Sequence, residues 1–442
     1  MTLLKRFLYF LILLVSCTHV HEPVYFQNIG EGWSGNTVNT VIFRHNGILT
    51  FNNIQITAFY DQDENIMLVK RNLSNNIIET YVIEDDFNTR NAHNSISLGV
   101  DKHGFLHLVY VNHGKVLRYQ KSMEPLSIEQ WSQLMSMTGI NEDKVTYPTF
   151  LNNPIDSTLI FVYRQGNAHR GTVYFKKYDA KNEEWIDYPN PIITGEQDSP
   201  TICPYWNHPV FDESGQLHLS FVWRKRPVNG KINNVGMHYI RSSDNGMTWY
   251  NCAGDSLFLP IIPESPTEIW SIPQLSNLIN QTSMAIDANS NPHIVYYSND
   301  TGQIPQYQHL WFDGNTWKNS TISLRKIPFN LEGKGTLQIP MSRPEVIVDK
   351  NDVVYMILRA DVSHDKLMVI SFLPLDYSPE NAKKEILCPI PVGYAEPLID
   401  RMRWQNDNTL TILVQFNHQP QTDKVLDYHT SPVFLGDWVF KP

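Results

Sequence analysis

The stretch that decides the fold is DKHGFLHLVY, at residues 101–110, where a polar turn is followed by the period-two alternation of a β-strand. The stretches DESGQLHLSF at 212–221 and DANSNPHIVY at 287–296 repeat the leading Asp and the His within the strand. Weaker copies begin near Asn52, Asn152, Asp349 and Gln405. The copies start roughly 50 to 75 residues apart, a spacing that suits four short antiparallel strands in each unit.

Seven such units in a chain of 442 residues predict an all-β protein, a seven-bladed β-propeller. Each blade alone would expose its apolar faces, and packing against its neighbours in a closed ring covers them. We expect Asp101, Asp212, Asp287 and Asp349 to lie in equivalent hairpin turns of different blades. The functional residues should then lie on the loops at the ends of the central channel, because several blades converge there.

Residues 24–442 are predicted to form one catalytic domain, because no linker-like segment interrupts them. Residues 24–50 should close the ring against a C-terminal strand near 437–440. One or two helical turns are expected at 127–135.

The octapeptide SSDNGMTW at 242–249 fits the Asp-box pattern, in which the Asp caps turn amides and the Trp enters the core. This motif is common in sialidase-like propellers and indicates the fold rather than the chemistry.

The N-terminus has the pattern of a secretion signal over residues 1–16. Two basic residues precede an apolar run at 7–15, which is too short to span a bilayer. The tetrapeptide LVSC that ends at Cys17 resembles a bacterial lipobox, which implies a lipid on Cys17; ordinary signal cleavage nearby is the alternative. We therefore expect a periplasmic or outer-membrane lipoprotein of a Gram-negative bacterium, held to the membrane only through this anchor.

Composition limits the partners of the chain. The net charge of -10 and the pI of about 5.9 provide no basic field for a nucleic acid. The spacing of Cys203, Cys252 and Cys388 suggests neither zinc nor a disulfide framework; a single Cys203–Cys252 bridge is the alternative. We expect a monomer that needs no metal or cofactor. Its aromatic content of 12% fits a strand-rich protein, and Trp and Tyr are also what sugar rings stack on.

Histidines at the ends of predicted strands are the candidates for chemistry. His93 precedes one strand, His113 ends the next, and His208 precedes a hairpin whose second half ends at Arg224. We expect these four side chains to meet at one mouth of the channel. Two imidazoles and a guanidinium suit β-elimination from a uronic acid, which needs a cation at the carboxylate, a base for the C5 proton and an acid for the leaving oxygen. The alternative is chance placement among 16 histidines.

The run from His93 to Arg224 resembles the BNR-4 group of propellers, through YPTF at 147–150, the pattern Tyr-Arg-x-Gly at 163–166 and LHLSFVWR at 217–224. This group includes polysaccharide lyases acting on ulvan or on rhamnose-capped glucuronate, and glycoside hydrolase family 145. In the ulvan lyases two His, a Tyr and an Arg carry the elimination. The resemblance assigns the two His to His93 and His113, and the Arg to Arg224. His208 stands where an Asn-x-Tyr-Pro pattern would place the Tyr, and this departure counts against ulvan itself.

A second resemblance concerns GNTVNTVIFRHN at 35–46, which is similar to the opening segment of glycoside hydrolase family 145. That family removes terminal L-rhamnose linked α-1,4 to D-glucuronic acid on arabinogalactan, with a single His on the face opposite the lyase-type site. His45 matches this His; the alternative is a surface His beside Arg44. One general acid/base contributes about 10²- to 10⁴-fold, so the substrate would have to participate. The adjacent acids at 85–86 and 142–143 do not form a glycosidase pair.

Three hypotheses follow for a glycan partner from the plant cell wall. The leading one is an exo-acting α-L-rhamnosidase that uses His45 and leaves a saturated glucuronic acid. The alternative is a rhamnose-glucuronate lyase that uses His93, His113, His208 and Arg224 and leaves an unsaturated one. The third is a propeller that binds glycan without catalysis. The residues expected to bind substrate are Arg44, Asn94, Tyr147, Arg164 and Tyr205.

Overall fold

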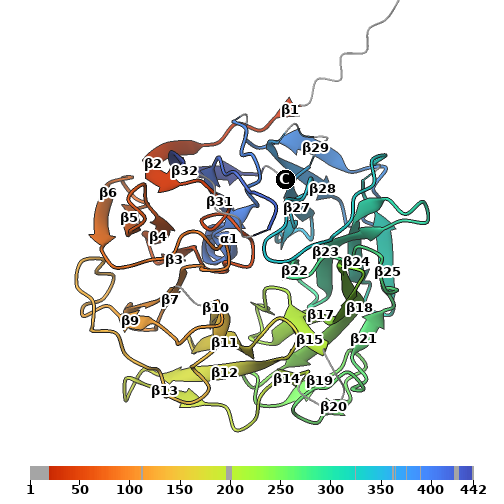
Figure 1. Ribbon diagram of the computed structural model, residues 1–442, viewed down its shortest axis with the longest axis horizontal. Coiled ribbons are helices and arrows are strands. Elements are labelled where there is room, and N and C mark those ends of the chain that lie inside the picture. Colours follow the sequence, from red (N-terminus) through yellow and green to blue (C-terminus); the bar gives the residue numbers. More distant parts are fainter. Residues whose placement is uncertain are drawn as a thin grey trace, which may run out of the picture.

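A computed structural model describes residues 19–110, 113–195, 202–323, 325–360, 363, 365–374, 376–388, 390–422 and 428–440. Small, mainly antiparallel sheets are arranged around a common centre (Figure 1). The prediction of an all-β propeller is confirmed. The predicted signal peptide and Cys17 lie outside the described residues, and no described helix is long and apolar enough to cross a membrane.

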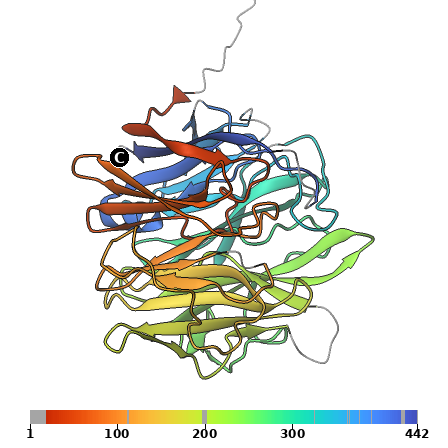
Figure 2. The same cartoon turned by 60° about the vertical axis from the view of Figure 1, so that its left-hand side comes forward.

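The sheets follow one another along the chain. The first three contain β3 (Ile48–Phe51), β4 (Ile54–Tyr60), β5 (Ile66–Asn72) and β6 (Ile78–Ile83); β7 (Ser97–Val100), β8 (Leu106–Val109) and β9 (Tyr119–Lys121); and β10 (Val145–Asn152), β11 (Leu159–Gly166), β12 (Gly171–Asp179), β13 (Glu184–Asp187) and β14 (Ile193–Thr194). The fourth contains β15 (Ile202–Trp206), β16 (Val210–Phe211), β17 (Leu217–Val228), β18 (Lys231–Ser242), β19 (Trp249–Tyr250), β20 (Ser256–Leu257) and β21 (Glu268–Trp270). Figure 2 shows the long β17–β18 hairpin, in bright green, projecting from the ring.

The last three sheets complete the ring. The fifth contains β22 (Ser283–Ile286), β23 (Pro292–Asn299), β24 (Pro305–Phe312) and β25 (Trp317–Thr321). The sixth contains β26 (Glu345–Val348), β27 (Val354–Arg359), β28 (Leu367–Phe372), β29 (Lys383–Ile386) and the short N-terminal β1 (His19–Val20). The seventh contains β30 (Leu398–Ile399), β31 (Thr409–Gln415), β32 (Thr430–Val439) and β2 (Tyr25–Trp33).

The two ends of the chain close the ring, as predicted. Strand β2 pairs antiparallel with β32, from Tyr25 opposite Asp437 to Trp33 opposite Thr430 (Figure 1). This N-terminal strand is thereby part of the last sheet, so that backbone hydrogen bonds close the ring. This pairing covers an edge of β32 that would otherwise be open to another chain.

The number of complete four-stranded blades is six, not the seven expected, because the sheet β7–β8–β9 has only three strands among the described residues. The segment after β9 contacts it through isolated bridges, Ser122 with Trp131 and Tyr119 with Met135, so no fourth strand forms there. The helical turns predicted at 127–135 are also absent from this segment. The helix lies instead at α1 (Arg401–Asp407), where the Asp400 carboxylate accepts the Arg403 backbone N–H at 3.0 Å. The weak repeat copy near Gln405 is therefore part of this helix.

The four repeat aspartates lie in equivalent turns, as predicted. The carboxylates of Asp101, Asp212, Asp287 and Asp349 each accept the backbone N–H groups two and four residues later, at 2.8 to 3.0 Å. Each of these turns joins two neighbouring strands near the start of its sheet. The repeat thus encodes a turn that supplies its own backbone hydrogen-bond acceptors.

The strand histidines of the repeat are buried and paired with these turns. The Nε2 atoms of His107, His218 and His293 lie 3.6, 3.2 and 3.8 Å from the carboxylates of their own repeat aspartates. The Nδ1 atoms of His107 and His218 contact the hydroxyls of Tyr119 and Tyr239 at 2.7 and 2.6 Å. These histidines therefore belong to the blade core and not to a site.

The Asp-box has the predicted structural role. The Asp244 carboxylate accepts the backbone N–H groups of Met247 and Thr248 at 3.0 and 2.8 Å. Gly246 takes a φ of 90°, and the fully buried Trp249 indole donates to the Gly246 carbonyl at 2.9 Å. The motif closes one hairpin of the fourth sheet.

Candidate functional site

Two histidines meet at the second sheet because the β7–β8 hairpin brings its flanking loops together. His93 comes from the loop before β7 and His113 from the loop after β8. Their rings stack with centroids 4.4 Å apart and an angle of 15° between the planes. The Phe43 ring lies against His93 at 4.8 Å. Burial, with the neighbouring His113 and nearby arginines adding to it, lowers the pKa of His93 well below its usual value. His93 is therefore a neutral imidazole near pH 7.

Tyr147 lies beside this pair in an unusual backbone conformation. The register of β10 against β11 shifts between Thr146 and Thr149, which marks a β-bulge, and Tyr147 has a φ of 58°. A bulky residue seldom takes a left-handed φ, and such strain is concentrated at functional sites. The Tyr147 ring lies 6.0 Å from both His93 and Tyr205. Burial, with Tyr205 adding to it, raises the pKa of the Tyr147 phenol, so this hydroxyl keeps its proton at neutral pH.

Two arginines from the next two sheets complete the cluster. The Arg164 guanidinium carbon lies 4.7 Å from the centre of the Tyr147 ring and 5.2 Å from that of Tyr205. Arg224 lies 4.0 Å from the centre of the Tyr205 ring and donates to its hydroxyl at 3.0 Å. Among the described residues neither arginine has a carboxylate partner, whereas the nearby Arg343 pairs with Glu396 at 3.0 Å. Neither of the first two cations is neutralised by a carboxylate of the described chain, so both make the cluster electropositive.

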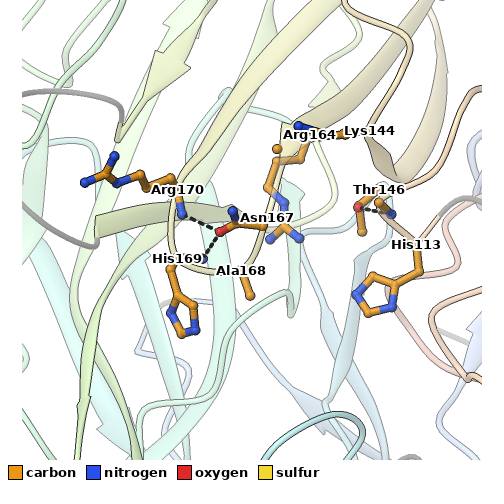
Figure 3. Close-up of a pocket in the computed structure, with 10 residues that line it drawn as sticks. His113, Lys144, Thr146, Arg164, Asn167, Ala168, His169 and Arg170 are labelled. Carbon is orange, nitrogen blue, oxygen red and sulfur yellow. Dashed lines mark hydrogen bonds between the residues drawn. The ribbon is translucent and has the colours of Figure 1, made fainter.

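A cavity of about 650 Å³ opens beside this cluster (Figure 3). Its charged lining residues are all basic, and its lining comprises His113, Gly114, Lys144, Thr146, Arg164, Gly166, Asn167, Ala168, His169 and Arg170. Figure 3 shows the Arg164 guanidinium between Asn167 and His113, while Arg170 extends away from them. The volume is that of an ordinary ligand pocket. The cavity therefore suits an acidic sugar, in a chain whose overall charge is negative.

A second cavity, on the side of the cluster that Arg224 lines, is much smaller. It has about 50 Å³ and is lined by His93, Tyr147, Arg224, Thr336 and Arg343 among others. This is room for one or two water molecules and not for a sugar. The larger cavity is therefore the one with room for a ligand, and it meets the cluster at His113 and Arg164.

His208 does not join this cluster, contrary to the sequence-based expectation. Its ring packs against His45, with centroids 4.4 Å apart at an angle of 70°. His208 lies between two register pairs, Trp206 with Phe221 and Val210 with His218. At about 3.3 Å per residue this places it roughly 15 Å from Arg224 along the strand direction. His93, His113 and Arg224 thus gather as expected, and His208 lies apart from them.

His45 is buried, not a surface residue, and it lines a cavity of only about 20 Å³ with His208, Glu345 and Arg401. Burial, with Arg401 adding to it, lowers the pKa of His45 to about 3. Its neighbour Arg44 is also buried and donates to the carbonyls of Asn39, Ala58 and Ile96. Neither side chain presents a surface to a glycan, so the expected role of Arg44 in substrate binding is replaced by a structural one.

The other expected binding residues divide in the same way. Asn94 is buried, and its amide donates to the Asn88 carbonyl at 2.8 Å, which holds the loop that carries His93. Tyr147, Arg164 and Tyr205 do belong to the cluster. The sequence-based interpretation gave Tyr147 only a binding role, because the residues around it do not predict the β-bulge. No group of three or more His, Cys, Asp or Glu in the described part of the chain could hold a metal ion.

The buried histidines predict acid destabilisation of the fold. Burial lowers the pKa of His45 to about 3 and that of His238 to about 4, from 6.5 in the unfolded chain. Below pH 6.5 the unfolded state therefore takes up protons that the folded state does not. The free energy of unfolding decreases as the pH is lowered through this range. At pH 5 each of the two should cost about 2 kcal/mol relative to pH 7. Urea denaturation at both pH values measures this difference, and equal midpoints would contradict it.

The comparisons with known proteins agree with this architecture. Residues 54–325 match the sequence model of the BNR repeat-containing family, BNR_4, and the chain belongs to this family. It is 22% identical over 305 residues to the short isoform of an ulvan lyase from Alteromonas sp. (strain LOR), covering 54% of this chain and 57% of that protein. A second ulvan lyase from the same strain is 22% identical over 265 residues, with 51% of each chain covered. The chain thus spans about half the length of the curated relatives it matches.

Two solved structures share the fold. The polysaccharide lyase Uly1 superposes with a TM-score of 0.71 at 14% identity, covering 95% of this chain and all of that one (100%). A PL25 ulvan lyase superposes with a TM-score of 0.59 at 14% identity, covering 82% of this chain and 96% of that one. At this level of identity the superpositions show the propeller fold alone.

Proposed function

We propose that this protein is a lyase that cleaves a glycosidic bond to O4 of a uronic acid by β-elimination. The observation that carries the proposal is a stacked histidine pair beside a protonated Tyr147, with His113 and Arg164 on the wall of a roomy cavity whose charged residues are all basic. The relatives named ulvan lyases support it. The leading hypothesis from sequence, a rhamnosidase that uses His45, has no such support, because the cavity at His45 cannot hold a sugar.

The chemistry assigns one role to each group. The Arg164 guanidinium holds the uronate carboxylate, which stabilises the negative charge that develops when the C5 proton leaves. A neutral imidazole of the stacked pair takes that proton. The C5–H electron pair becomes the C4=C5 double bond as the C4–O bond breaks, and the Tyr147 phenol gives its proton to the leaving oxygen. Proton exchange with solvent then restores the neutral imidazole and the phenol.

The substrate we propose is a glycan in which glucuronate alternates with, or is capped by, rhamnose. One protein of similar fold has been solved with a ligand described as -[GlcA(1-4)Rha3S]-, a repeat in which glucuronate alternates with rhamnose. The basic lining of the large cavity suits such an acidic glycan. Ulvan and a rhamnose-α-1,4-glucuronate oligosaccharide are therefore the two substrates to compare.

The product of the reaction tests this proposal. The purified protein is incubated with each glycan, and the acidic product is followed by ultraviolet absorbance and mass spectrometry. Elimination gives a product that absorbs through its C4=C5 double bond and is lighter by one water than the product of hydrolysis. A saturated product would restore the hydrolase hypothesis. Tight binding without any product would identify a glycan-binding propeller.

A further inference from the structure

A single side chain, Asn91, touches both histidines of the stacked pair. Its Oδ1 accepts the backbone N–H of His93 at 2.9 Å, in an Asx turn that leads into β7. A backbone nitrogen can only donate here, so this bond fixes which end of the Asn91 amide is the oxygen. The Nδ2 end must then face the other way, towards His113.

The fixed amide determines where each imidazole carries its proton. Asn91 Nδ2 lies 3.0 Å from His113 Nδ1. Because an NH₂ group only donates, His113 Nδ1 accepts and the proton of the neutral ring is on Nε2. Asn91 Oδ1 lies 3.1 Å from His93 Nδ1. Because this oxygen only accepts, His93 Nδ1 carries the proton, and its Nε2 has the free electron pair.

A second contact at the same nitrogen is compatible with this assignment. The Thr336 hydroxyl oxygen lies 3.2 Å from the same His93 Nδ1 and can accept a second, shared hydrogen bond from it. The two stacked rings therefore differ in the protonation of their Nε2 atoms. His93 presents a base at Nε2, and His113 presents an N–H donor at Nε2.

We propose that Asn91 is a positioning residue that holds His93 and His113 in opposite tautomers. His93 then removes the C5 proton, and His113 donates a hydrogen bond to the substrate beside it. This division of labour rests on the proposed elimination, whereas the tautomers themselves do not. Free imidazole side chains would otherwise exchange between the two forms.

Nitrogen NMR on protein labelled with ¹⁵N-histidine tests the tautomers without a substrate. The signals are assigned by their loss in His93→Gln and His113→Gln. We expect His93 protonated at Nδ1 and His113 at Nε2. In Asn91→Asp the carboxylate can only accept, so His113 should change to the Nδ1-protonated form; in Asn91→Leu both rings should exchange between forms. The same tautomer in both wild-type rings, or no change in either variant, would overturn the proposal.

A matched control and an activity measurement complete the test. Asn88→Ala removes another Asx bond of the same loop, from the Arg90 backbone N–H at 3.1 Å, without touching a histidine. It should leave both tautomers unchanged. On a substrate that is cleaved, Asn91→Asp, which holds His113 in the wrong form, should lower kcat by roughly 10²-fold or more, and Asn91→Leu, in which the rings exchange, by about tenfold, with KM little changed in both. Wild-type kcat in these variants would refute the proposal, whereas absence of cleavage by the wild type refutes the proposed function and leaves the NMR result to decide the tautomers.

Discussion

Replacing His93 by alanine is expected to lower kcat for formation of the unsaturated product by about 10²- to 10⁴-fold, because the base for the C5 proton is lost. KM should change much less, since the carboxylate still binds to Arg164. His103→Ala is the matched control, because His103 is an exposed histidine of the same blade, in the β7–β8 turn. Initial rates from ultraviolet absorbance measure the effect.

The variant His45→Ala distinguishes the hydrolase hypothesis from the proposed elimination. A rhamnosidase that uses His45 would lose activity in His45→Ala and keep it in His93→Ala. Elimination at the stacked pair reverses this order. Because His45 is buried, its variant is compared at a temperature well below its unfolding midpoint. A fully active His93→Ala would show that the proposed base is wrong.

Removing only the hydroxyl of Tyr147 is expected to have the second large effect. Tyr147→Phe keeps the ring between His93 and Arg164, so the packing and the strained backbone should persist. The leaving oxygen then lacks its proton donor, and kcat should fall by about 10²- to 10³-fold with KM nearly unchanged. For a substrate with a better leaving group at C4, the decrease in kcat should be smaller, because its leaving oxygen depends less on a proton donor.

Tyr163→Phe is the control for this variant. Tyr163 is fully buried on the neighbouring strand β11, and its hydroxyl has no hydrogen-bond partner among the described residues. Its removal should leave kcat unchanged. If Tyr147→Phe retains wild-type kcat, another group protonates the leaving oxygen and the assignment of Tyr147 fails.

The candidate site could be predicted only in part from sequence. The placement of His93 and His113 around one hairpin follows from local strand order, so their meeting was predictable. Arg224 joined them as expected, whereas His208 did not. That difference depends on the register of β15, β16 and β17, which the residues near His208 do not predict.

The sequence by itself determined the repeat and its turns. A turn such as the one at Asp101 is specified by a few adjacent residues, because the carboxylate caps amides only two and four positions away. The alternation of the following strand is equally local. The propeller follows from repeating such units, since each needs neighbours to cover its faces.

Only the tertiary structure decided which side chains share the site. His93 comes from the loop before β7, Tyr147 from β10 and Arg224 from β17, and their meeting depends on how the three sheets concerned are arranged around the common centre. The bulge that turns Tyr147 towards His93 arises from pairing with β11. Asn91 acquired its role only when His113, 22 residues later, came within hydrogen-bond distance. The physical reason is that turns form from contacts near in sequence, whereas this site forms from contacts distant in it.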